Sequence, residues 1–381
     1  MVKVVHVINS LGQGGAERSL AELLPYLERR GVDSTVVCLE RRVDGFHDEV
    51  VEAGFEVRVL PSGGMMKHAV RLRRSLRELR PDLLHTSVFD ADIVGRLAAA
   101  GRRVPVVGSI VNVSYDPIRL ADPRVKKWKL EGVRTLDGWT ARRLGDHFHA
   151  LTEAVKLAAI RDLGIPEDRI TVIPRGRDPK RLGTASGSRR ARTRAELGIP
   201  DDAEVIINVG RLEYQKGQRF LIEAMDQLRR RGHAGALLLL VGREGAESAE
   251  LGRLVGQLGL QSSVRFLGHR DDVPDLLASA DVFAFPSLYE GFGGALIEAM
   301  ALEVPIVASD LPPLREVVVS GAGRLVPAGS SDALADAIAY VLEDSNAADL
   351  LRIAGRRVFE ERYTLDAVAD AMVEMYRSTA L

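Results

Sequence analysis

Two acidic residues flank a glycine-rich stretch in the second half of the chain. Glu290 precedes Gly-Phe-Gly-Gly (291–294), and Glu298 follows eight residues later in a helix-forming run. The apolar residues 281–285 before this stretch predict a buried strand. Glycines at a helix start expose N–H groups that attract anions, and open α/β sheets bind ligands at such strand ends. A glycine-rich helix start with two solvated acids is the structural alternative.

Two basic residues follow another apolar run, residues 205–209. Arg211 and Lys216 lie in the next loop, and Gly217 leads into a helix-forming segment. Two cations at the end of a parallel strand suit a diphosphate, because Arg offers a planar fork and Lys a mobile point charge. Either cation alone is more often a solvated surface group, so the interpretation depends on both.

The elements that must position these residues are short apolar strands that alternate with amphipathic helices. This alternation predicts the α/β class with parallel sheets. Strands are expected at 2–8, 33–39, 55–60, 82–86 and 105–112, and again at 204–209, 236–241, 263–266, 281–285 and 305–308. Three helices are expected at the end of the chain, at 331–343, 347–361 and 365–378. The small polar residues 183–193 predict a hinge between two domains.

The pattern G-R-L-x-x-x-K-G (210–217), followed by E-x7-E (290–298), resembles the retaining glycosyltransferases of family 4, the glycosyl transferases of group 1. The resemblance covers nearly the whole chain, through GGAER (14–18), HTSVFDADIVGRLAA (85–99), VIPRGRD (172–178) and SADVFAFPSLYEGFG (279–293). It implies the GT-B fold, in which two Rossmann-like doubly wound domains face each other across a cleft. It also implies an acceptor-side domain (1–183), a sugar-nucleotide-binding domain (184–364) and a C-terminal helix (365–381) that packs back on the first domain.

The resemblance implies a role for each candidate residue. Arg211 and Lys216 bind the diphosphate, Glu298 binds the ribose hydroxyls, and Glu290 lies beside the sugar and the β-phosphate. Glu290, Arg211 and Lys216 form the catalytic set. The other donor-binding candidates are Gly14, Gly15, Gly291, Phe292 and Gly293. Asn112 is the acceptor-side candidate, at a position where many relatives carry a histidine, and asparagine cannot act as an acid or base near neutral pH.

The expected function is the retaining transfer of a hexosyl unit from a UDP- or GDP-sugar to a glycan or lipid-linked acceptor, in cell-envelope polysaccharide or glycoconjugate biosynthesis. No cofactor and no obligate metal are expected. The D-x-D of Asp90 and Asp92 is interpreted as helix capping, and His85 as a structural histidine. Three alternatives stay open: a non-catalytic sugar-nucleotide binder, which Asn112 permits, a nucleotide-sugar epimerase on the same fold, and a glycogen-type phosphorylase, which would need a longer chain.

Composition limits the cellular context. The chain has 381 residues, 46% of them hydrophobic, and no apolar run approaches the ~20 residues of a membrane span. The first residues (MVKVVHVINS) predict a strand rather than a signal peptide. Cys38 is the single cysteine, which excludes an internal disulfide and favours the cytosol.

Charge is unevenly distributed along the chain. Residues 1–183 carry 31 Lys and Arg against 24 Asp and Glu, whereas residues 184–381 carry 21 against 29. The basic segments 67–80 and 123–143, the second with Trp128 and Trp139, suit an anionic membrane surface. The alternative is a solvated arginine face over a packed apolar stripe. We therefore expect a cytoplasmic protein, with peripheral contact to the inner face of the plasma membrane as one option, and no nucleic-acid partner.

Overall fold

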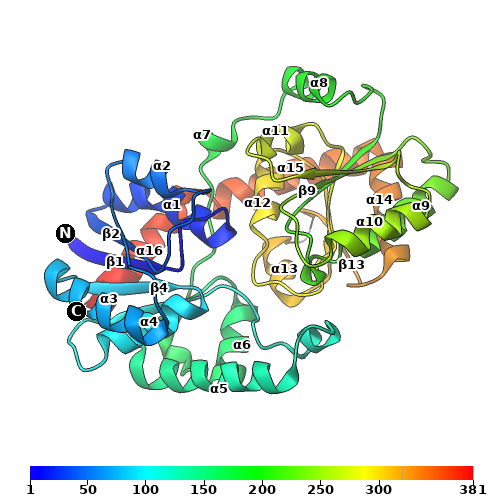
Figure 1. Cartoon of the computed structure of the whole chain (residues 1–381). Helices are drawn as coiled ribbons and strands as arrows, with labels where there is room; N and C mark the ends of the chain where they lie inside the picture. The colour runs from blue at the N-terminus through cyan, green and yellow to red at the C-terminus, as the bar shows by residue number, and fades with distance from the viewer. Residues whose placement is uncertain (320, 381) are drawn as a thin grey trace. The chain divides into compact units, whose positions relative to one another are not determined.

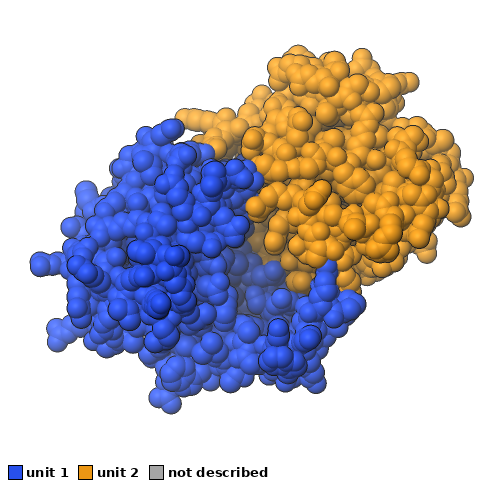
Figure 2. Space-filling view, viewed as in Figure 1, with its two compact units in different colours: residues 1–177, 364–381 blue, residues 178–363 orange. Residues whose placement is uncertain are grey.

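The computed structural model describes residues 1–319 and 321–380, which form two compact units (Figures 1 and 2). Unit 1 comprises Met1–Arg177 and the chain from Thr364 onward, and unit 2 comprises Asp178–Tyr363. The chain therefore passes between the units twice. The first passage lies earlier than the boundary expected after residue 183.

Unit 1 is built on a parallel sheet of seven strands in the order β3-β2-β1-β4-β5-β6-β7. The order reverses direction between β1 and β4, which makes the sheet doubly wound. The strands are β1 (Val2–Ile8), β2 (Val32–Cys38), β3 (Glu56–Val59), β4 (Leu83–Ser87), β5 (Val106–Ile110), β6 (His147–Ala150) and β7 (Ile170–Val172). The first five match the expected strands within a few residues. β6 and β7 were not anticipated, because four and three residues are too few for a clear pattern.

The helices of unit 1 include one from the far end of the chain. They are α1 (Gly15–Glu28), α2 (His47–Glu52), α3 (Met65–Leu79), α4 (Phe89–Ala99), α5 (Lys127–Leu144), α6 (Glu153–Leu163) and α16 (Leu365–Ala380), with 3-10 turns η1 (Pro117–Ala121) and η2 (Glu167–Arg169). Met372 and Tyr376 of α16 share a buried cluster with Val4 of β1 and Leu27 of α1. The last helix therefore completes the core of unit 1.

Unit 2 repeats the doubly wound plan with a parallel sheet of six strands in the order β10-β9-β8-β11-β12-β13. These are β8 (Val205–Val209), β9 (Leu237–Val241), β10 (Val264–Gly268), β11 (Val282–Phe285), β12 (Ile306–Ser309) and β13 (Arg324–Val326). The helices are α7 (Pro179–Leu182), α8 (Gly187–Glu196), α9 (Gln218–Arg230), α10 (Ser248–Gln257), α11 (Val273–Ala278), α12 (Gly294–Ala301), α13 (Pro312–Val317), α14 (Ser331–Glu343) and α15 (Ser345–Arg362), with the 3-10 turn η3 (Tyr214–Lys216). Its strands are almost wholly apolar because helices cover both faces of such a sheet.

The hinge expected at residues 183–193 is wrong. Most of this segment belongs to α8, which packs against α11 within unit 2. Arg194 of α8 is only 1% exposed, and its guanidinium donates to an Asp281 carboxylate oxygen at 2.8 Å. It also donates to the backbone carbonyl oxygens of Ser279, Pro200, Asp201 and Ala203. An arginine-rich polar segment has the composition of a linker, and only the tertiary structure supplies these acceptors.

Candidate active site

Two loops meet at the switch point of unit 2, where the neighbouring strands β8 and β11 end. The backbone N–H of Leu288 donates to Gln215 O at 2.8 Å, and Gln215 Nε2 donates to Tyr289 O at 2.9 Å. Gly217 has φ +63°, and a Cβ on it would lie 2.1 Å from Pro286 O, so only glycine fits this close approach. The loops after β8 and β11 therefore form one connected surface at the carboxyl edge of the sheet.

Lys216 and Glu290 are in direct contact on this surface. Lys216 Nζ donates to Glu290 Oε1, and the two side chains are 19% and 8% exposed. Ser287 Oγ donates to the same carboxylate oxygen at 3.1 Å, and Lys216 Nζ lies 5.1 Å from the centre of the Phe285 ring. Ser287 was not among the predicted site residues, although its position between the strand end and Glu290 is a usable signal.

Arg211 supplies a second positive charge in the same loop. Its side chain is exposed, and it makes no ion pair with any residue that the structure describes. The loop beneath it is held from inside, since buried Gln218 donates to Arg211 O at 2.9 Å and Asn208 Nδ2 donates to Ala284 O at 2.8 Å. A fixed loop thus presents an unpaired guanidinium to solvent, which suits an anionic ligand.

The remaining candidates of unit 2 surround the start of α12. Glu298 lies within α12 and is 4% exposed, and Gly291 is buried. Gly293 caps the helix with φ +80°, in the left-handed region that favours glycine. Phe292 is 2% exposed, and its ring packs edge-to-face on Tyr363 with centres 5.6 Å apart. The Phe292 side chain is therefore part of the core, and only its backbone is available to a ligand.

Gly14 and Gly15 lie at the N-terminus of α1 in unit 1. A Cβ on Gly14 would lie 2.0 Å from Glu17 Oε2, because the Glu17 carboxylate folds over the helix start. A Cβ on Gly15 would lie 3.3 Å from Arg175 Nη1. Arg175, one of two arginines in VIPRGRD, therefore brings a positive charge to the helix end that the two glycines open.

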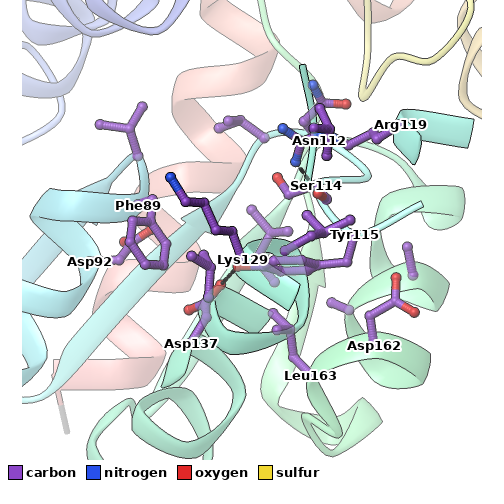
Figure 3. A pocket seen from close by; sticks show the side chains of 18 of the residues that line it. Phe89, Asp92, Asn112, Ser114, Tyr115, Arg119, Lys129, Asp137, Asp162 and Leu163 are labelled. Carbon is purple, nitrogen blue, oxygen red and sulfur yellow. Dashed lines mark hydrogen bonds between the residues drawn. The ribbon is translucent and has the colours of Figure 1, made fainter. Parts of the chain in front are cut away.

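Asn112 follows β5 in unit 1 and is half-buried. Its Oδ1 accepts from the backbone N–H of Val113 at 2.8 Å, so Nδ2 is its donor for a ligand. Asn112 also lines a cavity of about 410 Å³ that α4, α5 and α6 enclose with the loop after β5 (Figure 3). The predicted acceptor-side residue thus lies at a cavity large enough for a ligand.

The capping role expected for Asp90 and Asp92 is wrong. Both lie in the first turn of α4, but neither side chain caps the helix. Asn9 Oδ1 accepts from Ala91 N at 3.1 Å instead, and Asn9 Nδ2 donates to Asp90 Oδ2 at 3.1 Å. Asp92 is buried, where it accepts a hydrogen bond from Thr86 Oγ1, and burial raises its pKa to about 7. Across residues 1–319 and 321–380, no group of three or more His, Cys, Asp or Glu side chains is placed to hold a metal ion.

His85 is a structural histidine, as expected. Its Nδ1 is 2.6 Å from Tyr376 Oη and its Nε2 is 2.7 Å from Ser109 Oγ. The rings of His6 and His149 lie near it, one tilted and one edge-on, with centres 5.7 Å and 6.1 Å from that of His85. Burial lowers the pKa of His6 and of His149 to about 4, and burial together with these neighbours lowers the pKa of His85 well below its ordinary value.

The two basic helices differ in how they pack. Leu72 and Leu76 of α3 are fully buried, which confirms a packed apolar stripe beneath its arginines. In α5, however, Trp128 and Trp139 are 68% and 52% exposed, so the interpretation as a basic face over a packed apolar stripe is wrong for this helix. Among the described helices, none combines the length and the apolar character that crossing a bilayer requires.

Comparison with known proteins identifies the enzyme class. Residues 189–358 match the family model of glycosyl transferases group 1, and residues 14–176 match that of a glycosyl transferase 4-like domain. A D-inositol 3-phosphate glycosyltransferase of Kineococcus radiotolerans is 30% identical over 401 aligned residues, which cover 96% of this chain and 90% of that protein. An uncharacterized glycosyltransferase of Methanocaldococcus jannaschii is 33% identical over 216 residues, which cover 56% of this chain and 55% of that protein.

Solved structures agree with this assignment. The Anabaena protein HepE, in complex with UDP and glucose, superimposes with a TM-score of 0.84 at 26% identity, over 99% of this chain and 100% of that one. WaaG, a glycosyltransferase involved in lipopolysaccharide biosynthesis, has a TM-score of 0.78 at 18% identity, over 98% and 99% of the two chains, and supports the fold alone. The two doubly wound units and these likenesses confirm the GT-B fold. The chain belongs to the group 1 glycosyltransferases, and it is a transferase of glycosyl groups.

Proposed function

We propose that this glycosyltransferase moves a hexosyl unit from a nucleoside-diphosphate sugar to a glycan or lipid-linked acceptor with retention of configuration, as family 4 enzymes do. HepE, whose structures contain UDP, glucose and UDP-glucose, supports a donor of this kind. The observation that carries the proposal is the Lys216–Glu290 contact beside the unpaired Arg211, at the switch point of a doubly wound sheet.

Breaking the donor's glycosyl–phosphate bond sends its electron pair to the β-phosphate oxygen. Negative charge then grows on the leaving diphosphate and positive charge on the sugar carbon. Arg211 and Lys216 stabilise the diphosphate, because preorganised cations act most strongly where charge develops. The acceptor oxygen bonds to the sugar carbon on the face that the diphosphate leaves, and the acceptor proton passes to the departing phosphate. Configuration is retained without a covalent enzyme intermediate.

The Lys216–Glu290 pair suggests how the site holds its charges before the donor arrives. Without a ligand each residue neutralises the other, which lowers the cost of their partial burial. An incoming β-phosphate offers Lys216 a new partner, and the flexible lysine side chain can turn to it. Glu290 then becomes available to accept hydrogen bonds from the sugar hydroxyls, while Glu298 binds the ribose diol. The same two residues thus serve the free and the donor-bound states.

The proposed enzyme works without an obligate metal and in the cytoplasm. Arg211 and Lys216 supply the charge that a divalent cation would bring in other glycosyltransferases, so catalysis needs no obligate metal. The enzyme acts in the cytoplasm, in the synthesis of envelope polysaccharide or glycoconjugate. Peripheral contact with an anionic membrane uses the exposed Trp128 and Trp139 of α5 among the basic residues of that helix.

A donor panel tests the proposal. The full chain is incubated with UDP-, GDP- and ADP-sugars, and release of the free nucleoside diphosphate is measured with and without added EDTA. Slow release from one nucleotide class, lost in Arg211→Ala, is the expected result. Tight nucleotide binding with no release from any donor, across a wide set of acceptors, would show a sugar-nucleotide binder instead.

A further inference from the structure

The donor chemistry leaves the cavity beside Asn112 in unit 1 unexplained. Its volume of about 410 Å³ falls within the range of small-molecule sites. Figure 3 shows that Phe89 of α4, Lys129 of α5 and Leu163 of α6 contribute to its wall, with Asn112 on the loop after β5. That loop leaves the carboxyl end of a parallel strand, where doubly wound sheets bind their ligands.

The wall of this cavity is mainly apolar. Its apolar side chains include Val88, Phe89, Val111, Leu130, Val133 and Leu163. Each methylene group buried against such a surface raises the affinity roughly fourfold. The apolar part of the wall therefore offers room and contact for a hydrocarbon chain.

The acidic residues of the wall are already neutralised. Asp137 accepts from Arg96 at 2.6 Å and from Tyr115 Oη at 2.8 Å. Asp162 is bound by two guanidinium nitrogens of Arg161, each at 2.8 Å. Asp92 accepts from Thr86 Oγ1, and burial raises its pKa to about 7. These acids therefore place little uncompensated negative charge in the cavity.

The basic residues at its mouth are not balanced in the same way. Lys126 and Lys129 lie at the start of α5, are exposed, and form no ion pair with a described residue. Arg124, which also lines the cavity, is bound to Asp122 at 2.8 Å. Two lysines without an acidic partner beside an apolar cavity match a ligand with an anionic group at the end of its chain.

We propose that this cavity holds the hydrocarbon chain of a lipid-phosphate acceptor, with the phosphate at Lys126 and Lys129 and the sugar-accepting end toward Asn112. The inference rests on the proposed function and narrows its acceptor to the lipid-linked class. The chemical feature that the cavity recognises is an aliphatic chain that carries a phosphate group. An anionic membrane surface is a different ligand, and the experiment distinguishes alkyl phosphate binding in the cavity from docking on a membrane.

The experiment measures binding of hexyl, octyl and decyl phosphate to the full chain by calorimetry, below their micelle concentrations. The dissociation constant should fall about fourfold for each added CH₂ until the cavity is filled. Inorganic phosphate should bind far more weakly. Lys129→Gln should weaken alkyl phosphate binding about tenfold, because a charged hydrogen bond is lost, and leave the weaker binding of octanol unchanged. No dependence on chain length would overturn the proposal.

A matched pair of variants on α5 tests whether the hydrocarbon chain of the ligand occupies the cavity. Val133 and Leu136 are similarly exposed, 39% and 43%, but only Val133 lines the cavity. Val133→Glu should abolish decyl phosphate binding, whereas Leu136→Glu should leave it unchanged, with the melting temperature as the check on folding. Equal losses in both variants, together with binding only to anionic vesicles, would show surface docking instead and overturn the cavity assignment.

A separate readout keeps this inference apart from the proposed function. Nucleoside diphosphate release from the donor in the absence of acceptor uses the donor-binding residues, to which Val133 does not belong, so Val133→Glu should not change it. Donor turnover without alkyl phosphate binding would refute the cavity assignment and leave the proposed function intact. Alkyl phosphate binding without turnover of any donor would support the cavity and refute the proposed function.

Discussion

Glu290 and Glu298 should respond differently to the same conservative change. Glu290→Gln removes the acidic partner of Lys216, whose side chain is 19% exposed. Breaking a fully buried pair costs about 3–5 kcal/mol and an exposed one at most about 1 kcal/mol, so this partly buried pair should cost about 1–3 kcal/mol of unfolding free energy. A unit of this size loses roughly 2–4 °C in melting temperature per kcal/mol.

The nucleotide should offset part of this loss. A diphosphate gives Lys216 a new partner, so UDP or GDP should raise the melting temperature of Glu290→Gln at least as much as that of the unmodified protein. Nucleotide affinity should therefore be kept or slightly increased. The rate constant kcat should fall about 10²-fold, because Glu290 is assigned to the sugar end of the donor, where charge develops.

Glu298→Gln should show the opposite pattern. The ribose is present in free nucleotide and donor alike, and an amide accepts hydrogen bonds from a diol less strongly than a carboxylate does. Affinity for UDP or GDP should fall about fivefold to tenfold. Glu303→Gln, an exposed glutamate just after α12, is the matched control and should change neither quantity.

Calorimetric titration with nucleotide and steady-state rates decide between these outcomes. If Glu290→Gln loses nucleotide binding while Glu298→Gln keeps it, the two roles are reversed. If neither change affects binding or rate, the stretch from 290 to 298 is only a helix start, and the donor site lies elsewhere.

Three further outcomes are expected. Arg211→Ala and Lys216→Ala should each lower kcat/KM by about 10²–10³ with the fold intact by circular dichroism, and near-full turnover in either would refute the diphosphate assignment. Activity should survive EDTA, whereas complete loss restored by Mg²⁺ or Mn²⁺ would establish a metal requirement. Stability should fall as the pH drops from 6.5 toward 4, because His6, His85 and His149 are neutral when folded but bind protons when unfolded. Each of these histidines should lower the free energy of unfolding, measured by urea denaturation, by about 1.4 kcal/mol per pH unit. His149→Asn should reduce this pH dependence. A free energy of unfolding that stays constant from pH 7 to 5 would contradict the prediction.

Local sequence pattern was sufficient for most of the fold. Most strands of the two sheets are short apolar runs that helices cover on both faces, so their sequence pattern identifies them without tertiary information. The strands β6, β7 and β13, with only three or four residues each, were not predicted. The glycine-rich loops after β8 and β11 were predictable in the same way, because a close backbone approach such as that at Gly217 admits no side chain.

These patterns did not predict which side chains contact each other in the folded protein. Residues 183–193 have the composition of a linker, yet Arg194 is buried because the Ser279 carbonyl and the Asp281 carboxylate, both far away in the sequence, accept its hydrogen bonds. Asp90 and Asp92 occupy positions suited to capping, but Asn9 from another strand end makes the cap. In each case the deciding partner lies far away in the sequence.

The sequence by itself determined which residues could bind a diphosphate and a sugar, because charge and hydrogen-bonding capacity belong to each side chain. Only the tertiary structure decided that Lys216 and Glu290 are partners, that the Phe292 ring is packed away, and that an apolar cavity lies beside Asn112. Contacts, burial and cavities depend on which surfaces meet when the chain folds, and the order of residues along the chain does not specify distances between them.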